Sequence, residues 1–237
     1  MRGDESEETY CALAVYVDDI MLLTPSAITA ENFLTELRTF WITTPATITL
    51  SMVGLGIVRC GEENADVFVH QAKATRQLLE NNNMLHVNPV ETPAMSPPLT
   101  LRDRDLDSIE SLRDVDAQPL REIVGSLLWL STKTRPDMAS AVSNIAKVMN
   151  EPSSRTWIAV KRVLRYVRVT IDTGLRFRMD PDDTYPTLIG YSDSDWATDT
   201  DSRKSVSGYA LFLANGMIHG ARKSQNVVRC STAQAEL

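Results

Sequence analysis

The spacing of apolar residues divides the chain into strand-like segments near its two ends and helix-like segments in between. Short β-branched and aliphatic runs predict strands, whereas apolar residues three and four positions apart predict helices. The expected strands cover 11–17, 20–23, 47–59, 66–70, 188–191, 206–213, 217–223 and 226–229, and the expected helices cover 26–40, 71–84, 120–130, 136–148 and 155–169. This mixture of periods predicts an α+β fold.

Residues 88–119 interrupt the pattern. They hold five of the eleven prolines, together with many Asp and Arg residues, and they show no apolar period. Such a composition predicts a linker or a solvated loop. The expected domains are therefore 1–95, a linker over 96–119, a helical region over 120–178 and a last domain over 179–237.

Two adjacent carboxylates, Asp18 and Asp19, lie between the first two apolar runs. A strand, a tight turn and a returning strand place them at the tip of a buried hairpin. Buried carboxylates need a cation, a proton or water, and adjacent carboxylates are the hard oxygen ligands that Mg²⁺ uses together with substrate phosphates. An Asp-Asp pair is equally compatible with turn chemistry on a solvated loop, so the residues alone leave both interpretations open.

A second acidic segment follows the expected strand 188–191 and includes Asp193. Asn215-Gly216 is the strongest hairpin signal in the chain, and Ser231 or Thr232 is suited to cap a helix that contains Glu236. A strand that ends in Asp, a meander and a Glu in the next helix can bring Asp193 and Glu236 onto one metal pair. An acidic surface turn is the simpler alternative on local residues.

Charge is uneven along the chain. The formal net charge of -7 argues against nucleic-acid binding as a whole, but 155–178 holds seven Lys or Arg residues and one acid. Four of them lie on the expected helix 155–169 and are candidates for phosphate contact, with a solvated face as the alternative: Lys161, Arg162, Arg165 and Arg168.

Composition adds few constraints. A hydrophobic content of 43% is ordinary for a protein that buries a core, and the three separated cysteines favour buried thiols over disulfides or zinc ligands. No apolar run approaches the roughly 20 residues of a membrane span, and no signal region precedes the first strand. We expect an intracellular protein, cytoplasmic or nuclear, with no membrane partner and an oligomeric state that the sequence leaves open.

Several strings occur together in one order along nearly the whole chain. They are Tyr16-Val17-Asp18-Asp19, Leu55-Gly56-Ile57, Thr134-Arg135-Pro136-Asp137, Lys161–Tyr166, Tyr191–Ala197 and Arg203–Tyr209. In this order they resemble the Pol polyprotein of copia-type retrotransposons. The resemblance implies part of a reverse-transcriptase palm and thumb, a helical connection and the N-terminal half of a ribonuclease H-like sheet. Two departures are Thr44-Pro45-Ala46 in place of the family's Asp-Leu-Gly, and Gln234 and Leu237 in the last string.

The family's activities are RNA-directed DNA synthesis and cleavage of the RNA strand of an RNA–DNA hybrid, both by two-metal catalysis with Mg²⁺ or Mn²⁺. By resemblance, the catalytic and metal-binding residues are Asp18, Asp19, Asp193 and Glu236. The implied partners are an RNA–DNA hybrid or primer–template, and dNTPs. Because part of each carboxylate set is missing, we expect a polyprotein fragment that is inactive alone. The alternatives are a non-catalytic nucleic-acid-binding remnant and a pseudogene product.

Overall fold

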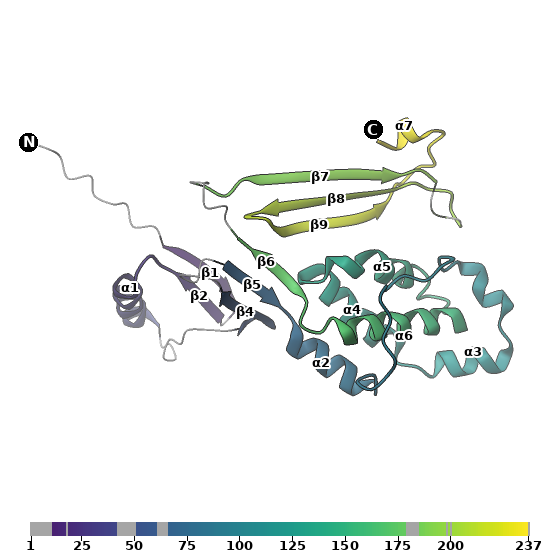
Figure 1. The fold of residues 1–237 in the computed structure, drawn as a ribbon, viewed down its shortest axis with the longest axis horizontal. Helices are drawn as coiled ribbons and strands as arrows, with labels where there is room; N and C mark the ends of the chain where they lie inside the picture. The colour runs from purple at the N-terminus through teal and green to yellow at the C-terminus, as the bar shows by residue number, and fades with distance from the viewer. Residues whose placement is uncertain are drawn as a thin grey trace, which may run out of the picture. The chain divides into compact units, whose positions relative to one another are not determined.

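The computed structural model describes residues 11–17, 19–41, 51–60, 66–178, 185–197, 199 and 201–236 (Figure 1). The chain divides into two compact units, Met1–Ile57 and Val58–Leu237. The described residues mix helices and strands, as the apolar spacing predicts, so the α+β class is confirmed.

The first unit contains a two-stranded hairpin and a helix, and its boundary with the second unit lies within strand β4 (Leu55–Cys60). Strands β1 (Ala12–Tyr16) and β2 (Asp19–Leu23) pair antiparallel, with Tyr16 opposite Asp19. Helix α1 (Ala27–Phe40) begins at Ser26, whose hydroxyl accepts a hydrogen bond from the Thr29 amide at 3.2 Å. The predicted helix is confirmed, and Ser26 caps it.

Burial of the first hairpin was predicted, and the described residues contradict it. Val15 is 59% exposed and Val17 is 86% exposed. Helix α1 buries none of its residues and therefore supplies no cover for the strands. A two-stranded hairpin with a single helix has too little apolar surface to enclose a core of its own.

The strand expected over 47–59 is a hairpin in its described part. Strands β3 (Ser51–Met52) and β4 (Leu55–Cys60) pair antiparallel across Val53 and Gly54, whose φ angles are 51° and 74°. Two consecutive left-handed residues reverse the chain tightly. The prediction of one strand is wrong, because the many β-branched residues on both sides of the turn favour extended structure and no Asn or Asp marks the turn.

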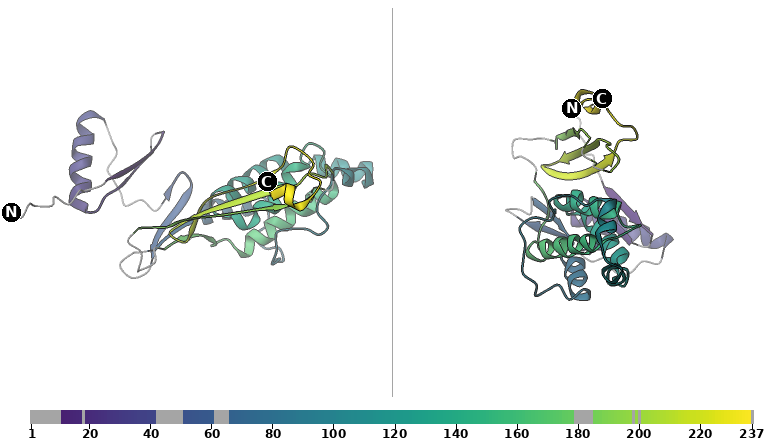
Figure 2. Two further views of the ribbon diagram at one scale, coloured as in Figure 1. Left: turned by 90° about the horizontal axis from the view of Figure 1, so that it is seen from above. Right: turned by 90° about the vertical axis from the view of Figure 1, so that its right-hand side faces the viewer.

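The second unit contains a helical body and a separate three-stranded sheet (Figures 1 and 2). The helical body contains α2 (Ala72–Asn81), η2 (Leu101–Leu106), α3 (Ile109–Asp116), α4 (Leu120–Lys133), η3 (Pro136–Met138), α5 (Ala139–Lys147) and α6 (Ser154–Val169). Helices α4, α5 and α6 pack against one another, and their fully buried side chains include Leu127, Val142, Val160 and Leu164. The apolar face predicted for α6 therefore forms the centre of this core, with Trp157 half-buried at its edge.

The segment predicted as a linker is folded onto this body. It contains η2 and α3, and it buries Leu99, Asp103 and Val115. Proline content misled the prediction, because the polar residues here cap helices and form ion pairs instead of facing water. The boundary between compact units also lies at Ile57–Val58 and not near residue 95, so β5 and α2 belong with the helical body.

Strands of the second unit form two antiparallel groups. Strand β5 (Asp66–His70) pairs with β6 (Gly174–Phe177), and a meander joins β7 (Leu188–Asp195), β8 (Val206–Leu213) and β9 (Gly216–Ser224). Helix α7 (Thr232–Glu236) packs against β7 and β8. The predicted antiparallel sheet is confirmed, but β7 continues through Asp195, and the strand expected over 226–229 is absent from the described residues.

The hairpin between β8 and β9 turns one residue earlier than its strongest signal. Ala214 and Asn215 carry the left-handed φ angles, 48° and 59°, while Gly216 is the first residue of β9. A Cβ atom on Gly216 would lie 2.3 Å from a ring carbon of Phe177. Gly216 is therefore required by the close approach of β6 and not by the turn, which a sequence pattern cannot distinguish.

Candidate metal and nucleic-acid sites

The first acidic site is described on one side of its turn only. Asp18 lies outside the described residues, and Asp19 is exposed as the first residue of β2. Val17, directly before the pair, has a φ of 54°. A β-branched residue in this region is strained, and such strain concentrates at functional turns. The predicted hairpin is thus present, with its exposed side chains at a strained tip.

The second acidic site is formed on β7. Asp193 lies within this strand, directly opposite Gly208 of β8, and its side chain is exposed. One carboxylate oxygen, Oδ1, accepts a hydrogen bond from the Ser194 amide at 2.9 Å. The exposed carboxylate supplies the hard oxygen donors that Mg²⁺ takes, with waters or phosphate oxygens filling the rest of the octahedral shell.

Glu236 is carried by α7, the short helix that packs on the same strand. Ala235 is buried beneath this helix, while Glu236 itself is exposed. The side-chain amide nitrogen of Gln225, Nε2, donates to the Ala235 carbonyl at 2.7 Å and to the Ser207 hydroxyl at 2.9 Å. Gln225 therefore ties α7 to the sheet face that carries Ser207, a role that nothing in the sequence pattern indicated. Asp193 pairs with Gly208 and points to the other face, so these contacts do not bring Glu236 to Asp193. Among the described residues, no three His, Cys, Asp or Glu side chains are grouped as a metal site.

The loop that follows Asp193 is attached to the helical body by charge. The Lys147 ammonium on α5 donates to Asp199 at 2.7 Å and to Asp201 at 2.9 Å. Burial alone raises the pKa of Asp199, but the hydrogen bonds from Lys147 and from the Ser202 amide outweigh it and lower the pKa to about 2. The same carboxylates raise the pKa of Lys147 against the opposing effect of its own burial. The contact holds the β7–β8 loop against α5.

Three of the four basic residues predicted to bind phosphate have partners inside the molecule. Arg162 donates to the Thr92 hydroxyl at 2.7 Å, while Arg165 and Arg168 donate at 2.6 Å to main-chain carbonyls of the same neighbouring segment, Asn88 and Leu85. These bonds fasten residues 85–92 along α6. Lys161 differs, because its ammonium lies 5.3 Å from the ring centre of Trp157.

The string Thr134-Arg135-Pro136-Asp137 forms a cluster of internal bonds around the buried Arg135 side chain. The Arg135 side chain is 2% exposed and donates two hydrogen bonds to Asp137, at 3.0 and 2.8 Å, and two more to Thr170. Tyr166 donates to Asp137 at 2.7 Å, and its ring lies beneath the Arg135 guanidinium. Burial raises the pKa of Asp137, but these hydrogen bonds outweigh it and lower the pKa overall.

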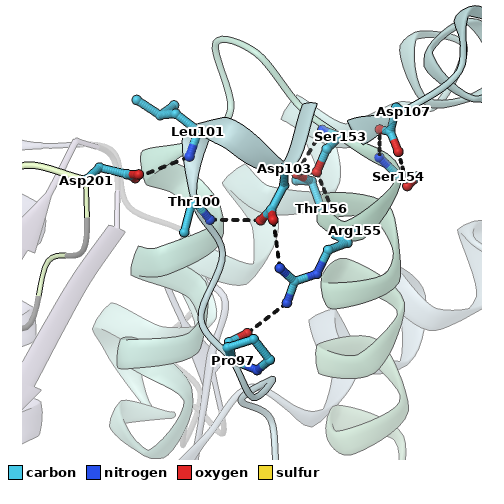
Figure 3. A network of polar contacts seen from close by, with 10 residues as sticks. All are labelled: Pro97, Thr100, Leu101, Asp103, Asp107, Ser153, Ser154, Arg155, Thr156 and Asp201. Carbon is cyan, nitrogen blue, oxygen red and sulfur yellow. Dashed lines mark hydrogen bonds and ion pairs between the residues drawn. The ribbon is translucent and has the colours of Figure 1, made fainter. Parts of the chain in front are cut away.

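A second polar network closes the helical body where α6 begins (Figure 3). Asp103 accepts from the Thr100 amide at 2.8 Å and from Arg155 at 2.7 Å, and Arg155 also donates to the Pro97 carbonyl. Asp107 accepts from the Ser154 amide at 2.6 Å. Sequence reasoning missed this network, although Thr100 and Asp103 have capping-box spacing that could have marked it.

The structure tests the prediction that the cysteines are free and buried. Cys11, Cys60 and Cys230 are all free, as expected, but Cys11 and Cys230 are exposed, so burial of the thiols is wrong for these two. Among the described residues, no helix has the length and apolarity to cross a membrane.

Comparisons with known proteins identify relatives along the whole chain. No family model and no solved structure matches it. The retrovirus-related Pol polyprotein from transposon TNT 1-94 of Nicotiana tabacum is 30% identical over 98% of this chain, and that from transposon RE2 of Arabidopsis thaliana is 33% identical over 94%. The chain spans 17% and 14% of the length of these two relatives.

A shorter relative matches over most of its own length. An uncharacterized mitochondrial protein of Arabidopsis thaliana is 35% identical over 94% of this chain and 88% of its own length. The resemblance drawn from the sequence strings is confirmed by these matches. The chain is therefore a segment homologous to retrotransposon polyproteins, and it belongs to the family of retrovirus-related Pol polyproteins from transposons.

Proposed function

We propose that this chain is the part of a reverse transcriptase and ribonuclease H that holds an RNA–DNA hybrid and contributes carboxylates to metal sites. The observation that carries the proposal is the order of the elements, in which an exposed Asp193 on the first strand of an antiparallel meander is followed by a helix with an exposed Glu236. The Pol polyprotein relatives support the same conclusion.

The proposed roles follow the chemistry of the side chains. Asp193 and Glu236 hold Mg²⁺ or Mn²⁺ for hybrid cleavage, and Asp18 and Asp19 hold it for DNA synthesis from dNTPs. The metal, when bound, polarises a phosphate oxygen and activates the attacking oxygen. In the isolated chain, two carboxylates at each site bind divalent metal weakly, because most of the shell is then water. We therefore propose that the isolated chain binds hybrid but neither extends a primer nor cleaves RNA.

The test is a labelled RNA–DNA hybrid incubated with the full chain and Mg²⁺ or Mn²⁺. We expect binding that weakens steeply as salt rises, because phosphate contacts release counterions. We also expect no RNA cleavage and no primer extension. Absence of binding at low salt would overturn the hybrid-binding role.

An active isolated chain would overturn the other half of the proposal. Cleavage that disappears in Asp193→Asn but persists in Asp172→Asn would show that the chain is a complete nuclease. Asp172 is the matched control, because it is an exposed aspartate that follows α6, away from β7. Primer extension would likewise show that the polymerase site is sufficient.

A further inference from the structure

Asp193 lies in a cross-strand row of the sheet whose third member is a cation. Asp193 of β7 is opposite Gly208 of β8, and Gly208 is opposite Arg222 of β9. The irregularity in the β8–β9 pairing falls at Leu211 and Phe212, beyond this row. Directly opposed residues in antiparallel strands point to the same face of a sheet. Asp193 and Arg222 therefore share one face, separated by a glycine.

The middle of the row is open. Neighbouring strands lie about 4.8 Å apart, so the backbones that carry Asp193 and Arg222 are roughly 10 Å apart. A Cβ atom built on Gly208 would have only the Ala221 carbonyl within 4 Å, at 3.8 Å. Nothing of Gly208 itself rises between the two charged side chains. The row has a carboxylate at one end, a guanidinium at the other and space for a ligand in between.

Arg222 has no internal role in the part of the chain that the structure describes. Its side chain is exposed, and it forms neither a hydrogen bond nor an ion pair with any described residue. Arginines of the helical body behave differently, because Arg135, Arg155 and Arg168 are all held by carboxylates or carbonyls. The guanidinium of Arg222 is thus available to a ligand of opposite charge.

We propose that Arg222 binds the phosphodiester backbone of the RNA strand beside Asp193, on the open side of Gly208. A guanidinium matches two phosphate oxygens at once, and a backbone phosphate placed over Gly208 can contact it while facing the carboxylate end of the row. This assignment rests on the proposed function, since it takes the hybrid as the ligand. It makes Arg222 a substrate-binding residue that sets where the strand lies relative to Asp193.

The next residue along β9 provides a matched control. Lys223 is also exposed and also cationic, but it pairs with Ser207, which pairs with Ser194, so its row lies on the opposite face of the sheet. Arg222→Ala and Lys223→Ala remove the same charge from adjacent positions. Non-specific attraction affects both variants alike, whereas a phosphate contact beside Asp193 affects only the first.

The experiment measures the affinity of the full chain for a fluorescently labelled RNA–DNA hybrid by anisotropy, at several salt concentrations. For Arg222→Ala we expect roughly tenfold weaker binding and a salt slope smaller by about 1, because one charged phosphate contact is lost. Lys223→Ala changes the affinity by less than about twofold, and Arg222→Lys lies between Arg222→Ala and the unmodified chain.

Two further results would each decide the matter. Equal losses in Arg222→Ala and Lys223→Ala, with hybrid still bound by the unmodified chain, would overturn the assignment of Arg222 and leave the proposed function standing. A chain that binds no hybrid at any salt would overturn the proposed function and this inference together.

A second variant tests the open row without touching either charge. Gly208→Val places a branched side chain between Asp193 and Arg222, at a strand position where the added Cβ is in ordinary van der Waals contact with the Ala221 carbonyl. We expect weaker hybrid binding with an unchanged thermal midpoint. Unchanged binding in a folded Gly208→Val chain would mean that the ligand does not lie in this row.

Discussion

In the helical body, several charged side chains are held by internal bonds, whereas on the β7–β9 sheet Asp193 and Arg222 extend into solvent. Arg135 forms four hydrogen bonds while 2% exposed, and Arg168 donates to a carbonyl of the segment that it fastens. Asp193 and Arg222, in contrast, are exposed in the middle of strands. Arginine and aspartate therefore have different roles in the two regions. In the helical body they stabilise packed helices, and on the sheet they are exposed on an open face.

This difference separates two kinds of sequence string. Thr134–Asp137 stabilises the fold, since its arginine and aspartate bond to each other and to α6. In Tyr191–Ala197, one of the two aspartates, Asp193, forms no ion pair with a described residue. A short string shared with a family therefore identifies the family equally well in both cases, but only the surroundings of the side chain tell whether it serves stability or chemistry.

Removal of the most enclosed charge has the largest expected effect. Arg135→Met leaves Asp137 without its bidentate partner and frees the Thr170 carbonyl, so the free energy of unfolding falls by about 3 kcal/mol. Urea denaturation followed by circular dichroism measures it. Arg121→Met, on the exposed face of α4, is the control and changes stability by less than about 0.5 kcal/mol. Equal effects in both variants would show that the Arg135 cluster is not a stabilising element.

An intermediate effect is expected on the basic face of α6, where Arg168 is bonded internally and Lys161 is not. Arg168→Ala removes the donor to the Leu85 carbonyl, at a cost of roughly 1–2 kcal/mol, and exposes residues 85–92 to limited proteolysis. Lys161→Ala, which breaks no hydrogen bond among the described residues, leaves the cleavage rate unchanged. If Arg168→Ala instead weakens hybrid binding with no change in proteolysis, the original phosphate-binding assignment of this helix holds.

The Lys147 contact predicts a dependence on pH that can be isolated by subtraction. The pKa of Asp199 is lowered to about 2, so the stability that it contributes is complete above the ordinary Asp value near 3.8. It is lost as the pH falls toward 2. We therefore compare the urea midpoints of the unmodified chain and of Lys147→Met. Their difference should be constant between pH 5 and 7 and should shrink below about pH 4. A difference that stays constant down to pH 2 would contradict the ion pair.

The smallest effect is expected on the open sheet. Asp193→Asn removes a charge that has no ion pair among the described residues, so the free energy of unfolding changes by less than about 0.5 kcal/mol. Thermal denaturation monitored in the near ultraviolet measures it. A loss above about 2 kcal/mol would place Asp193 with the structural charges of the helical body and remove the contrast between the two regions.

Local sequence patterns predicted helices and strands better than they predicted which side chains bond to each other. The helices α1 and α6 and the buried face of α6 follow from the spacing of apolar residues a few positions apart, and each is present. The partners of Lys147 and Arg135 lie far along the chain or on another helix, so no local pattern contains them. The error at 88–119 has a similar origin, because its polar residues are stabilised by α6, which a reading of that segment alone does not include.

The candidate site was predictable only in part. The position of Asp193 on a strand and of Glu236 on a following helix could be read from the order of apolar runs and turns. The row that joins Asp193 to Arg222 could not, because it depends on the register of three strands, and a shift of one residue would send Arg222 to the other face.

The exposed hairpin of the first unit has a consequence for handling the protein. Strands β1 and β2 have no further strand partner among the described residues, and Val15, Val17 and Ile20 are all exposed. Open edges beside apolar side chains are templates for intermolecular β-pairing. Purified chain should therefore self-associate through residues 12–23 as its concentration rises, and a lysine at Val15 or Ile20 should delay precipitation without altering the helical body.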